Sequence, residues 1–200
     1  MIETNKERQA PKKLEETEPS HLARYRFALE FIEDDDIVLD APCGTGYGSA
    51  LLTERSKKVY GVDISSPAIE HANELFCNDN NCFFVCDIQD MKMFKDAYFD
   101  VIVSFQGIER IKNPHKFLEE IKRVLRPEGR LIISTPRKPE GSEYHIVEFN
   151  LEEFKTILSK YFNITGMFGQ IYTEIFDLEA KKIDAFAYNR FDYIALCVNR

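Results

Sequence analysis

The sequence predicts an α/β fold in which a mostly parallel sheet carries helices on both faces. Three observations support it. Short apolar runs alternate with helical segments between residues 37 and 134, a glycine-rich turn follows the first run, and an aspartate follows each of the first three. Alternating strands and helices form a parallel sheet because each helix returns the chain to the same edge.

Length and composition favour one domain with one site. The chain has 200 residues, of which 44% are hydrophobic, which is enough for one sizeable core. Residues 1–19 are charged, interrupted by proline and almost without apolar periodicity, so we expect a flexible N-terminal arm that a ligand could order. Residues 20–200 would then form the single domain.

The first helix is expected to begin at Ser20, whose hydroxyl can cap it. Apolar residues then recur at helical spacing, and the run Asp34-Asp35-Asp36 ends the helix. The recurring residues are Leu22, Ala23, Phe27, Ala28, Phe31 and Ile32.

Five short apolar runs follow, each typical of a buried strand. They are residues 37–39, 58–62, 82–85, 100–104 and 130–134. Helical segments are expected between them at about residues 48–55, 67–76 and 114–125, and Pro127 and Gly129 close the last one.

The C-terminal part has a different order of elements. A helix is predicted from about Leu151 to Lys160, followed by a strand at residues 162–166. A long polar and aromatic connection then precedes the last apolar run, residues 193–198. Because no full crossover helix lies between these two strands, we expect them to form an antiparallel edge.

Composition also narrows the function. The net charge of −8 repels a nucleic-acid backbone on average, so a nucleic-acid partner is not expected. No apolar run approaches the roughly 20 residues that cross a bilayer, and the polar start lacks a signal peptide's apolar stretch, so we expect a cytoplasmic protein. The five cysteines include no Cys-x-x-Cys pair and the histidines are scattered, which favours reduced, mostly buried thiols and no metal site.

Residues 38–49 predict a strand, a glycine-rich turn and the start of a helix. Gly44, Gly46 and Gly48 would let the backbone come close to a ligand. A purely structural turn is the alternative, because many tight turns are rich in glycine.

Three aspartates favour a ligand at this turn and indicate its chemistry. Asp40 precedes the turn, where its charge would oppose a dinucleotide pyrophosphate and attract an ammonium group. Asp63 ends the second strand at a position suited to both ribose hydroxyls, and Asp87 follows the third strand, where it can meet the adenine edge. Ile64 and Ile88 could cover the two faces of the ring. Each aspartate could instead be a solvated strand end or a helix cap. Their joint placement at the carboxyl ends of the strands nevertheless predicts one site for an amino-acid-bearing nucleoside.

From about His21 to Phe162 the chain resembles the class I methyltransferase family. The resemblance lies in residues 40–48, 61–65, 86–88, 99–104 and 123–131. Residues 21–25, 134–136 and 145–149 are similar, more narrowly, to bacterial members linked with glycan or polysaccharide modification.

The resemblance implies a Rossmann-like, seven-stranded sheet with an antiparallel last strand, and S-adenosyl-L-methionine as the cofactor, with S-adenosyl-L-homocysteine as its product. It also implies that Arg24 and Tyr25 close over the methionine end of the cofactor. The further cofactor contacts that it implies are Asp40, Gly44, Gly46, Asp63, Ile64, Asp87, Ile88 and Phe105.

Two departures from the family pattern stand out. Members commonly carry Glu-His after the fourth strand, but here Glu109 is followed by Arg110, which removes an imidazole from the expected substrate cleft. The usual Pro-Gly-Gly turn is Pro127-Glu128-Gly129, which is a turn variant.

Methyl transfer from a sulfonium is an in-line displacement in which the protein mainly aligns the acceptor and excludes water. For a hydroxyl acceptor a base helps, and Glu109 and His145 are the candidates. The alternatives are an ordinary loop histidine and a Glu109 that caps a helix or pairs with Arg110. Arg110, Arg137 and Lys138 could bind an anionic substrate, or form a solvated charge cluster.

Aromatic residues fill the connection before the last strand. They could form a substrate lid, a homodimer surface or ordinary core packing. They are Phe168, Tyr172, Phe176, Phe186, Tyr188 and Phe191.

The sequence therefore predicts an S-adenosylmethionine-dependent methyltransferase that acts on a small-molecule or glycan acceptor by O-methylation. A catalytically silent cofactor-binding protein is one alternative, because Arg110 replaces the usual histidine. An NAD-dependent oxidoreductase is the other, and Asp40 together with the glycine spacing argues against it.

Overall fold

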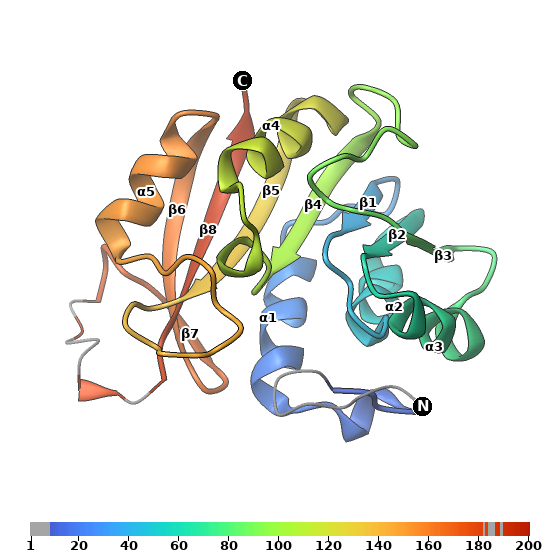
Figure 1. The fold of residues 1–200 in the computed structure, drawn as a ribbon, viewed down its shortest axis with the longest axis horizontal. Helices are drawn as coiled ribbons and strands as arrows, with labels where there is room; N and C mark the ends of the chain where they lie inside the picture. Colours follow the sequence, from blue (N-terminus) through green and yellow to red (C-terminus); the bar gives the residue numbers. More distant parts are fainter. Residues whose placement is uncertain (1–8, 182, 184–186, 189) are drawn as a thin grey trace.

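An eight-stranded sheet lies between two layers of helices (Figure 1). The structure is a computed structural model that describes residues 9–181, 183, 187–188 and 190–200. In sheet order, the strands are β3 (Asn81–Val85), β2 (Lys58–Asp63), β1 (Ile37–Asp40), β4 (Phe99–Phe105), β5 (Leu125–Pro136), β8 (Asp192–Asn199), β6 (Phe162–Ile171) and β7 (Glu174–Asp177).

The first five strands along the chain pair parallel, and β8 lies antiparallel between β5 and β6. This confirms the predicted mostly parallel sheet with an antiparallel last strand. The predicted count of seven strands is one short, because β7 pairs antiparallel with the end of β6. With only four residues, β7 is too short to show a strand pattern of its own, and it forms by pairing with the neighbouring strand.

In the described residues, five α-helices connect and cover the strands. They are α1 (Pro19–Leu29), α2 (Tyr47–Leu52), α3 (Ser66–Phe76), α4 (Pro114–Val124) and α5 (Leu151–Ser159). Three single turns of 3-10 helix accompany them, η1 (Leu14–Glu16), η2 (Thr53–Arg55) and η3 (Ile108–Arg110). The helices of the alternating region thus match their predicted positions to within a few residues.

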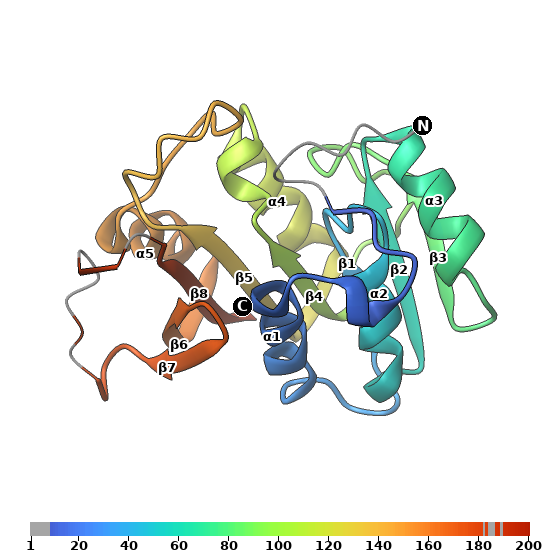
Figure 2. The same ribbon diagram turned by 90° about the horizontal axis from the view of Figure 1, so that it is seen from below.

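The helices pack on both faces of the sheet because successive side chains of a strand point to opposite sides. Leu39 belongs to the core beneath α4 and α5, together with Phe117. Its neighbour Val38 belongs to the core beneath α1 and α2, together with Ala28 and Leu52. Figure 2, seen from below, shows α1 and α2 on the opposite side of the sheet from α4.

The start of α1 corrects one prediction. The helix begins at Pro19 rather than Ser20, and its N-cap is Glu18, whose carboxylate accepts a hydrogen bond from the Ser20 backbone N–H at 3.1 Å. The Ser20 hydroxyl donates to the same carboxylate instead of capping the helix. The reason is that Pro19 occupies the first helical turn, for which its fixed φ is suited. The helix ends at Leu29, before the three aspartates.

The aromatic connection divides into packed and exposed members. Phe168 packs against Phe27 with ring centroids 4.8 Å apart, and Phe176 packs against Phe191 at 6.0 Å. The others are Tyr172 and Tyr188, which are exposed, and Phe186, which lies outside the described residues. Core packing therefore accounts for at least half of these rings.

The cysteines are free thiols, but the prediction that most are buried is wrong. Cys43 and Cys197 are buried, whereas Cys82 and Cys86 are partly exposed and Cys77 is exposed. The exposed ones lie on or beside β3, which is an edge strand of the sheet. In the described part of the chain no group of three or more His, Cys, Asp or Glu side chains is placed to hold a metal ion.

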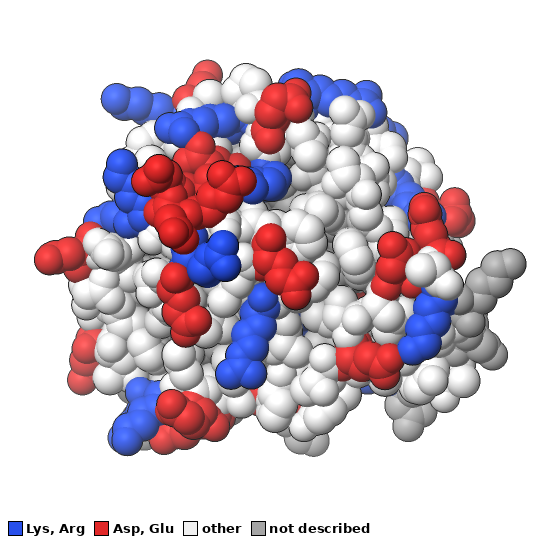
Figure 3. Space-filling view, turned by 180° about the vertical axis from the view of Figure 1, so that it is seen from behind, with Lys and Arg blue, Asp and Glu red and all other residues white. Residues whose placement is uncertain are grey.

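Across the described ranges, no helix has the length and apolar character needed to span a membrane. On the face of the molecule shown in Figure 3, Lys and Arg side chains are interspersed with Asp and Glu. A mixed surface of this kind has no broad basic field that would attract a polyanion.

Candidate functional site

The glycine-rich turn joins β1 to α2 and borders a cavity of about 120 Å³. Gly44 and Gly46 have φ values of +56° and +86°, in the left-handed region that favours glycine. A Cβ at Gly46 would lie 2.7 Å from the Cβ of Ala72 and 2.8 Å from the ring of Phe83. Only glycine therefore allows the turn to pack this closely on α3 and β3.

Asp63, at the end of β2, lies directly beside this turn. Its Oδ2 accepts a hydrogen bond from the Gly44 backbone N–H at 3.0 Å, and its Oδ1 accepts one from the Ser65 N–H at 2.9 Å. The side chain is 5% exposed in total and lines the cavity. The carboxylate is thus held in one orientation at the position where the sequence predicts a ribose contact.

Asp40 is fully buried behind the turn. Its carboxylate accepts hydrogen bonds from the Ser49 hydroxyl at 2.6 Å and from the Tyr25 hydroxyl at 3.2 Å. Burial raises the pKa of Asp40 to about 7, although these two hydrogen bonds oppose the shift. Asp40 does not itself line the cavity, and its predicted contact with an ammonium group remains a prediction.

Arg24, Tyr25 and Phe105 line the same cavity. The Arg24 guanidinium is 2% exposed; its Nη1 donates to Gln170 at 2.9 Å and forms an ion pair with Asp192. These contacts connect α1 to β6 and β8. The Tyr25 ring packs edge-on against the Phe105 ring at 5.0 Å, so the two rings close one wall of the cavity.

The three residues predicted to surround an adenine ring follow β2 and β3. Ile64 is 70% exposed, and Asp87 is exposed with its Oδ1 accepting the Gln89 N–H at 2.9 Å. Ile88 is mostly buried in the core. The three lie at the same sheet edge as the glycine turn but outside the cavity, so their contact with a ligand stays a prediction.

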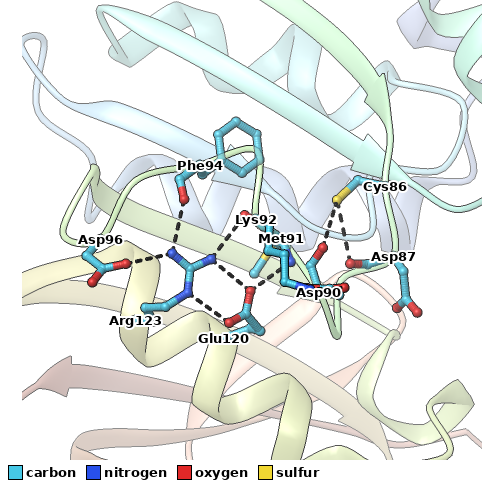
Figure 4. A network of polar contacts seen from close by, with 9 residues as sticks. All are labelled: Cys86, Asp87, Asp90, Met91, Lys92, Phe94, Asp96, Glu120 and Arg123. Atoms are coloured by element: carbon cyan, nitrogen blue, oxygen red, sulfur yellow. Dashed lines mark hydrogen bonds and ion pairs between the residues drawn. The ribbon is translucent and has the colours of Figure 1, made fainter.

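A polar network holds the segment that follows Asp87 and Ile88 (Figure 4). The Arg123 guanidinium on α4 donates to the carbonyl oxygens of Met91 and Phe94, both at 3.0 Å, and to Glu120 at 2.8 Å. The Met91 N–H donates to the same Glu120 carboxylate at 2.7 Å. Hydrogen bonds from Arg123 lower the pKa of Glu120, so this network is charged and anchors the segment to α4.

A second cavity of about 170 Å³ adjoins the first. Four described residues line both cavities, namely Gln9, His21, Gln106 and Arg110. The second cavity is also lined by Glu18, Glu140, His145 and Arg190. The shared walls place the two cavities next to each other.

His21 stands between them in the neutral form. Burial, followed by the charges of Arg24, Arg190 and Arg110, lowers the pKa of His21 to about 3. Its Nδ1 lies 2.8 Å from the Tyr47 hydroxyl and 3.2 Å from the Gln9 amide nitrogen. Both groups can donate, which leaves the ring proton on Nε2.

The two predicted base candidates occupy different places. His145 lines the second cavity, and its Nδ1 lies 3.5 Å from Glu140 and 3.8 Å from Glu148. Glu109 is 1% exposed and lines neither cavity, and burial raises its pKa to about 7. Its backbone carbonyl accepts the N–H groups of the two residues after His145, at 2.8 and 3.0 Å. Glu109 therefore supports the loop that carries His145.

The two arginines predicted to bind an anion also lie in different places. Arg110 lines both cavities, with its Nε 3.7 Å from the Glu109 carboxylate. Arg137 donates to the Tyr188 carbonyl at 3.4 Å and lines neither cavity. Substrate binding by either one remains a prediction.

Sequence reasoning missed several lining residues. His21 lies within one of the segments that carry the family resemblance, so that segment was a usable signal. Gln106 has a positive φ of 51°, and Gln9 and Arg190 reach the cavities from distant parts of the chain. Neither a backbone dihedral angle nor a contact between residues far apart in the chain can be predicted from the local sequence pattern.

The described part of the N-terminal arm lies against the glycine turn. The Thr45 hydroxyl donates to the Gln9 carbonyl at 2.8 Å, and His71 Nε2 lies 3.1 Å from the Pro11 carbonyl. The Glu18 N–H donates to the Gln9 side chain at 2.7 Å. Whether this arm is flexible in solution remains a prediction.

The fold and the site define an open α/β domain with a cavity beside Asp63 and the glycine turn, at the carboxyl ends of its parallel strands, which is where folds of this class bind their ligands. Residues 39–133 match the family described as "Methyltransferase domain". These residues form a methyltransferase domain of the class I S-adenosylmethionine-dependent type, whose cofactor is S-adenosyl-L-methionine.

Relatives in sequence agree with this assignment. The chain is 31% identical over 129 residues to a Mycobacterium tuberculosis protein named "Probable S-adenosylmethionine-dependent methyltransferase", covering 60% of this chain and 46% of that protein. The chain spans about half the length of the first curated relatives that it matches.

Among solved structures, a chain from the complex between the Haloferax volcanii Trm112 methyltransferase activator and a protein assigned as a methyltransferase has a TM-score of 0.77 and 18% identity, covering 93% of both chains. A geranyl diphosphate methyltransferase in complex with S-adenosylmethionine has a TM-score of 0.69 and 19% identity, covering 90% of this chain and 85% of that one. At these identities the likeness shows the fold alone.

Proposed function

We propose that this chain transfers a methyl group from S-adenosyl-L-methionine to an oxygen of a small-molecule or glycan acceptor. The observation that carries the proposal is the pair of adjoining cavities, one beside Asp63 and the glycine turn and one beyond His21. A transferase needs two such neighbouring sites, because both reactants must be held together and away from water.

The residues of the first cavity suit the cofactor. The left-handed turn at Gly44 and Gly46 lets a ligand approach the backbone closely, and the carboxylate of Asp63, held in one orientation in the cavity wall, is an acceptor suited to ribose hydroxyls. The Asp63 carboxylate in the cavity wall would attract a positively charged group of the ligand.

When bound, S-adenosyl-L-methionine supplies a methyl group on a positively charged sulfur. The chain's own residues have the tasks of binding, aligning and excluding water. Tyr25 and Phe105 form an apolar wall, and the neutral His21 adds no positive charge between the cavities. Gln106 and Arg110 reach both cavities, which is the place from which an acceptor can be aligned.

His145 is the group that we propose as the base for a hydroxyl acceptor. It lines the second cavity, and Glu140 and Glu148 beside its Nδ1 would stabilise the imidazolium that forms when it takes a proton. Glu109 acts in this proposal as a positioning residue, through its backbone contacts to the His145 loop and its carboxylate, which accepts the Thr135 hydroxyl at 3.2 Å.

The proposal is tested first by calorimetric titration with S-adenosyl-L-homocysteine and with NAD. We expect the former to bind, and Asp63→Asn to weaken binding about 10- to 100-fold, because a charged hydrogen-bond acceptor is lost. Asp34→Asn is the matched control, since Asp34 is 88% exposed at the far end of the sheet from the site. Binding of NAD but not of S-adenosyl-L-homocysteine would contradict the cofactor assignment.

A screen with methyl-labelled cofactor against hydroxylated metabolites and glycans tests the transfer itself. We expect label in an acceptor, and His145→Gln to lower kcat at least tenfold with KM for the cofactor unchanged. Intact cofactor binding with no labelled acceptor would favour the silent binding protein. Equal loss of kcat in Glu109→Gln and His145→Gln, with an altered pH profile only for Glu109→Gln, would move the base to Glu109.

A cytoplasmic location and a homodimer are part of this proposal, and nucleic acid is not among the proposed acceptors. The acidic net charge supports the last point. Exposed Tyr172 and Tyr188 are candidates for a surface between subunits, which analytical ultracentrifugation would detect.

A further inference from the structure

We propose that the second cavity binds an acidic acceptor, one that carries a carboxylate or a phosphate, through donor groups of Gln106, Arg110 and Arg190. The inference rests on the proposed function, because it names the acceptor class of the same site. It is carried by four features of the cavity, namely its lining, its charge, the electrostatic environment of His21 and a buried donor on Gln106.

The lining is polar throughout the described residues. It consists of Gln9, Glu18, His21, Gln106, Arg110, Glu140, His145 and Arg190. Sites for apolar ligands are lined mainly by hydrophobic and aromatic side chains, and apart from two histidine rings none faces this cavity among the residues that the structure describes there. At about 170 Å³ the cavity suits a small, polar molecule or the polar end of a larger one.

The cavity contains two guanidinium groups and two carboxylates, and both carboxylates already have partners. Glu18 caps α1 by accepting the Ser20 N–H at 3.1 Å. Glu140 lies 3.5 Å from His145 Nδ1. A guanidinium carries five donor N–H groups, so an arginine can keep a contact within the protein and still bind an oxyanion.

His21 lies within the electrostatic influence of three arginines. The pKa of its imidazole is lowered to about 3, first by burial and then by Arg24, Arg190 and Arg110. Three arginines therefore act together on one ring at the boundary of the two cavities. The arginines thus place positive charge at this boundary, although the chain as a whole carries a charge of −8.

Gln106 adds a donor with a defined position. It follows β4 with a φ of 51°, and its backbone N–H donates to the Ser134 carbonyl and hydroxyl oxygens, both at 3.2 Å. Its side-chain Nε2 is buried and has no hydrogen-bond partner among the described residues. A buried donor without an acceptor is unfavourable, and an oxygen of a bound anion would satisfy it. A strained backbone that the surroundings hold in place is a common feature of ligand sites.

The test uses the full chain saturated with S-adenosyl-L-homocysteine, and follows calorimetry and the melting temperature. The probes are inorganic phosphate, succinate and the uncharged succinamide. We expect phosphate or succinate to bind and to raise the melting temperature, and succinamide to do neither. The stronger of the two anions identifies which oxyanion the acceptor carries.

The variants are Arg190→Gln and Gln106→Leu, with Arg26→Gln as the control. Arg190 is exposed, so its variant is expected to fold. Arg26 lies exposed on α1, lines neither cavity, and its replacement changes the net charge by the same amount. We expect Arg190→Gln and Gln106→Leu to weaken anion binding about tenfold or more, and Arg26→Gln to leave it unchanged.

The inference is overturned if succinamide protects as well as succinate, if neither anion binds, or if Arg190→Gln binds them as the wild type does. S-adenosyl-L-homocysteine binding is measured first in every protein. Its absence in the wild type refutes the proposed function. Its presence without anion binding refutes only the acidic acceptor.

Discussion

Replacing Asp40 by asparagine should change how the stability of the protein depends on pH. Burial raises the pKa of Asp40 to about 7 from an ordinary value of 3.8. Between these two values the folded protein holds a proton that the unfolded chain has lost. The free energy of unfolding therefore falls as pH rises through this window.

The size of the effect follows from the two pKa values. Each pH unit within the window corresponds to about 1.4 kcal/mol. Between about pH 5 and pH 8, Asp40 should lower the free energy of unfolding of the wild type by about 2 to 3 kcal/mol. Asparagine cannot ionise, so the free energy of unfolding of Asp40→Asn lacks this pH-dependent contribution. Relative to the wild type, the variant should be more stable at pH 8 than at pH 5 by that amount.

Urea denaturation at a series of pH values measures this difference. Glu109, whose pKa burial also raises to about 7, titrates in both proteins and cancels from the comparison. Asp34→Asn, at an exposed carboxylate, should show a pH-independent difference from the wild type. A difference between Asp40→Asn and the wild type that is the same at pH 5 and pH 8 would refute the argument.

Three further substitutions test the packing around the site, each by urea denaturation and by the binding of S-adenosyl-L-homocysteine. Gly46→Ala should lower the free energy of unfolding by about 2 to 4 kcal/mol and weaken binding, because the new methyl group both strains φ and overlaps Ala72 and Phe83. Gly44→Ala should lower it by only about 1 to 2 kcal/mol, because a Cβ there would meet nothing within 4 Å. Equal losses in the two variants would contradict the predicted overlap at Gly46. Arg123→Met should lower the free energy of unfolding by about 1 to 2 kcal/mol and weaken binding, because it releases the segment after β3. The control Arg55→Met, at an exposed ion pair, should lower it by less than about 1 kcal/mol. Intact binding by Arg123→Met would show that the polar network does not support the ligand site. Arg24→Met should cost about 3 to 5 kcal/mol, because it leaves a buried carboxylate uncompensated, and a loss below about 1 kcal/mol would show that this pair is solvated.

Local patterns in the sequence were sufficient for the order of the elements. The apolar runs from Ile37 to Ser134 predicted five strands that form, and the segments between them predicted the helices. The antiparallel last strand also followed from the missing crossover helix. What failed was local and small: β7 is too short for a pattern, and Pro19 displaces Ser20 from the cap of α1.

For the site, the sequence determined the glycine turn and the aspartates at the strand ends, because both depend on their distance from a strand. The placement of Asp63 against Gly44 at 3.0 Å agrees with that expectation. Their strand-end positions are visible in a linear pattern because parallel strands all end at one edge of the sheet.

Only the tertiary structure decided which side chains face the cavities. It brought Gln9 and Arg190, at opposite ends of the chain, to one cavity, and it placed Glu109 beneath the wall rather than in it. Side-chain exposure and pKa depend on neighbours that lie far away in the sequence, so burial around Asp40 and the arginines around His21 left no signal in it. The chain order fixes which edge of the sheet carries the glycine turn and the aspartates, while packing between distant segments fixes which groups line the cavities.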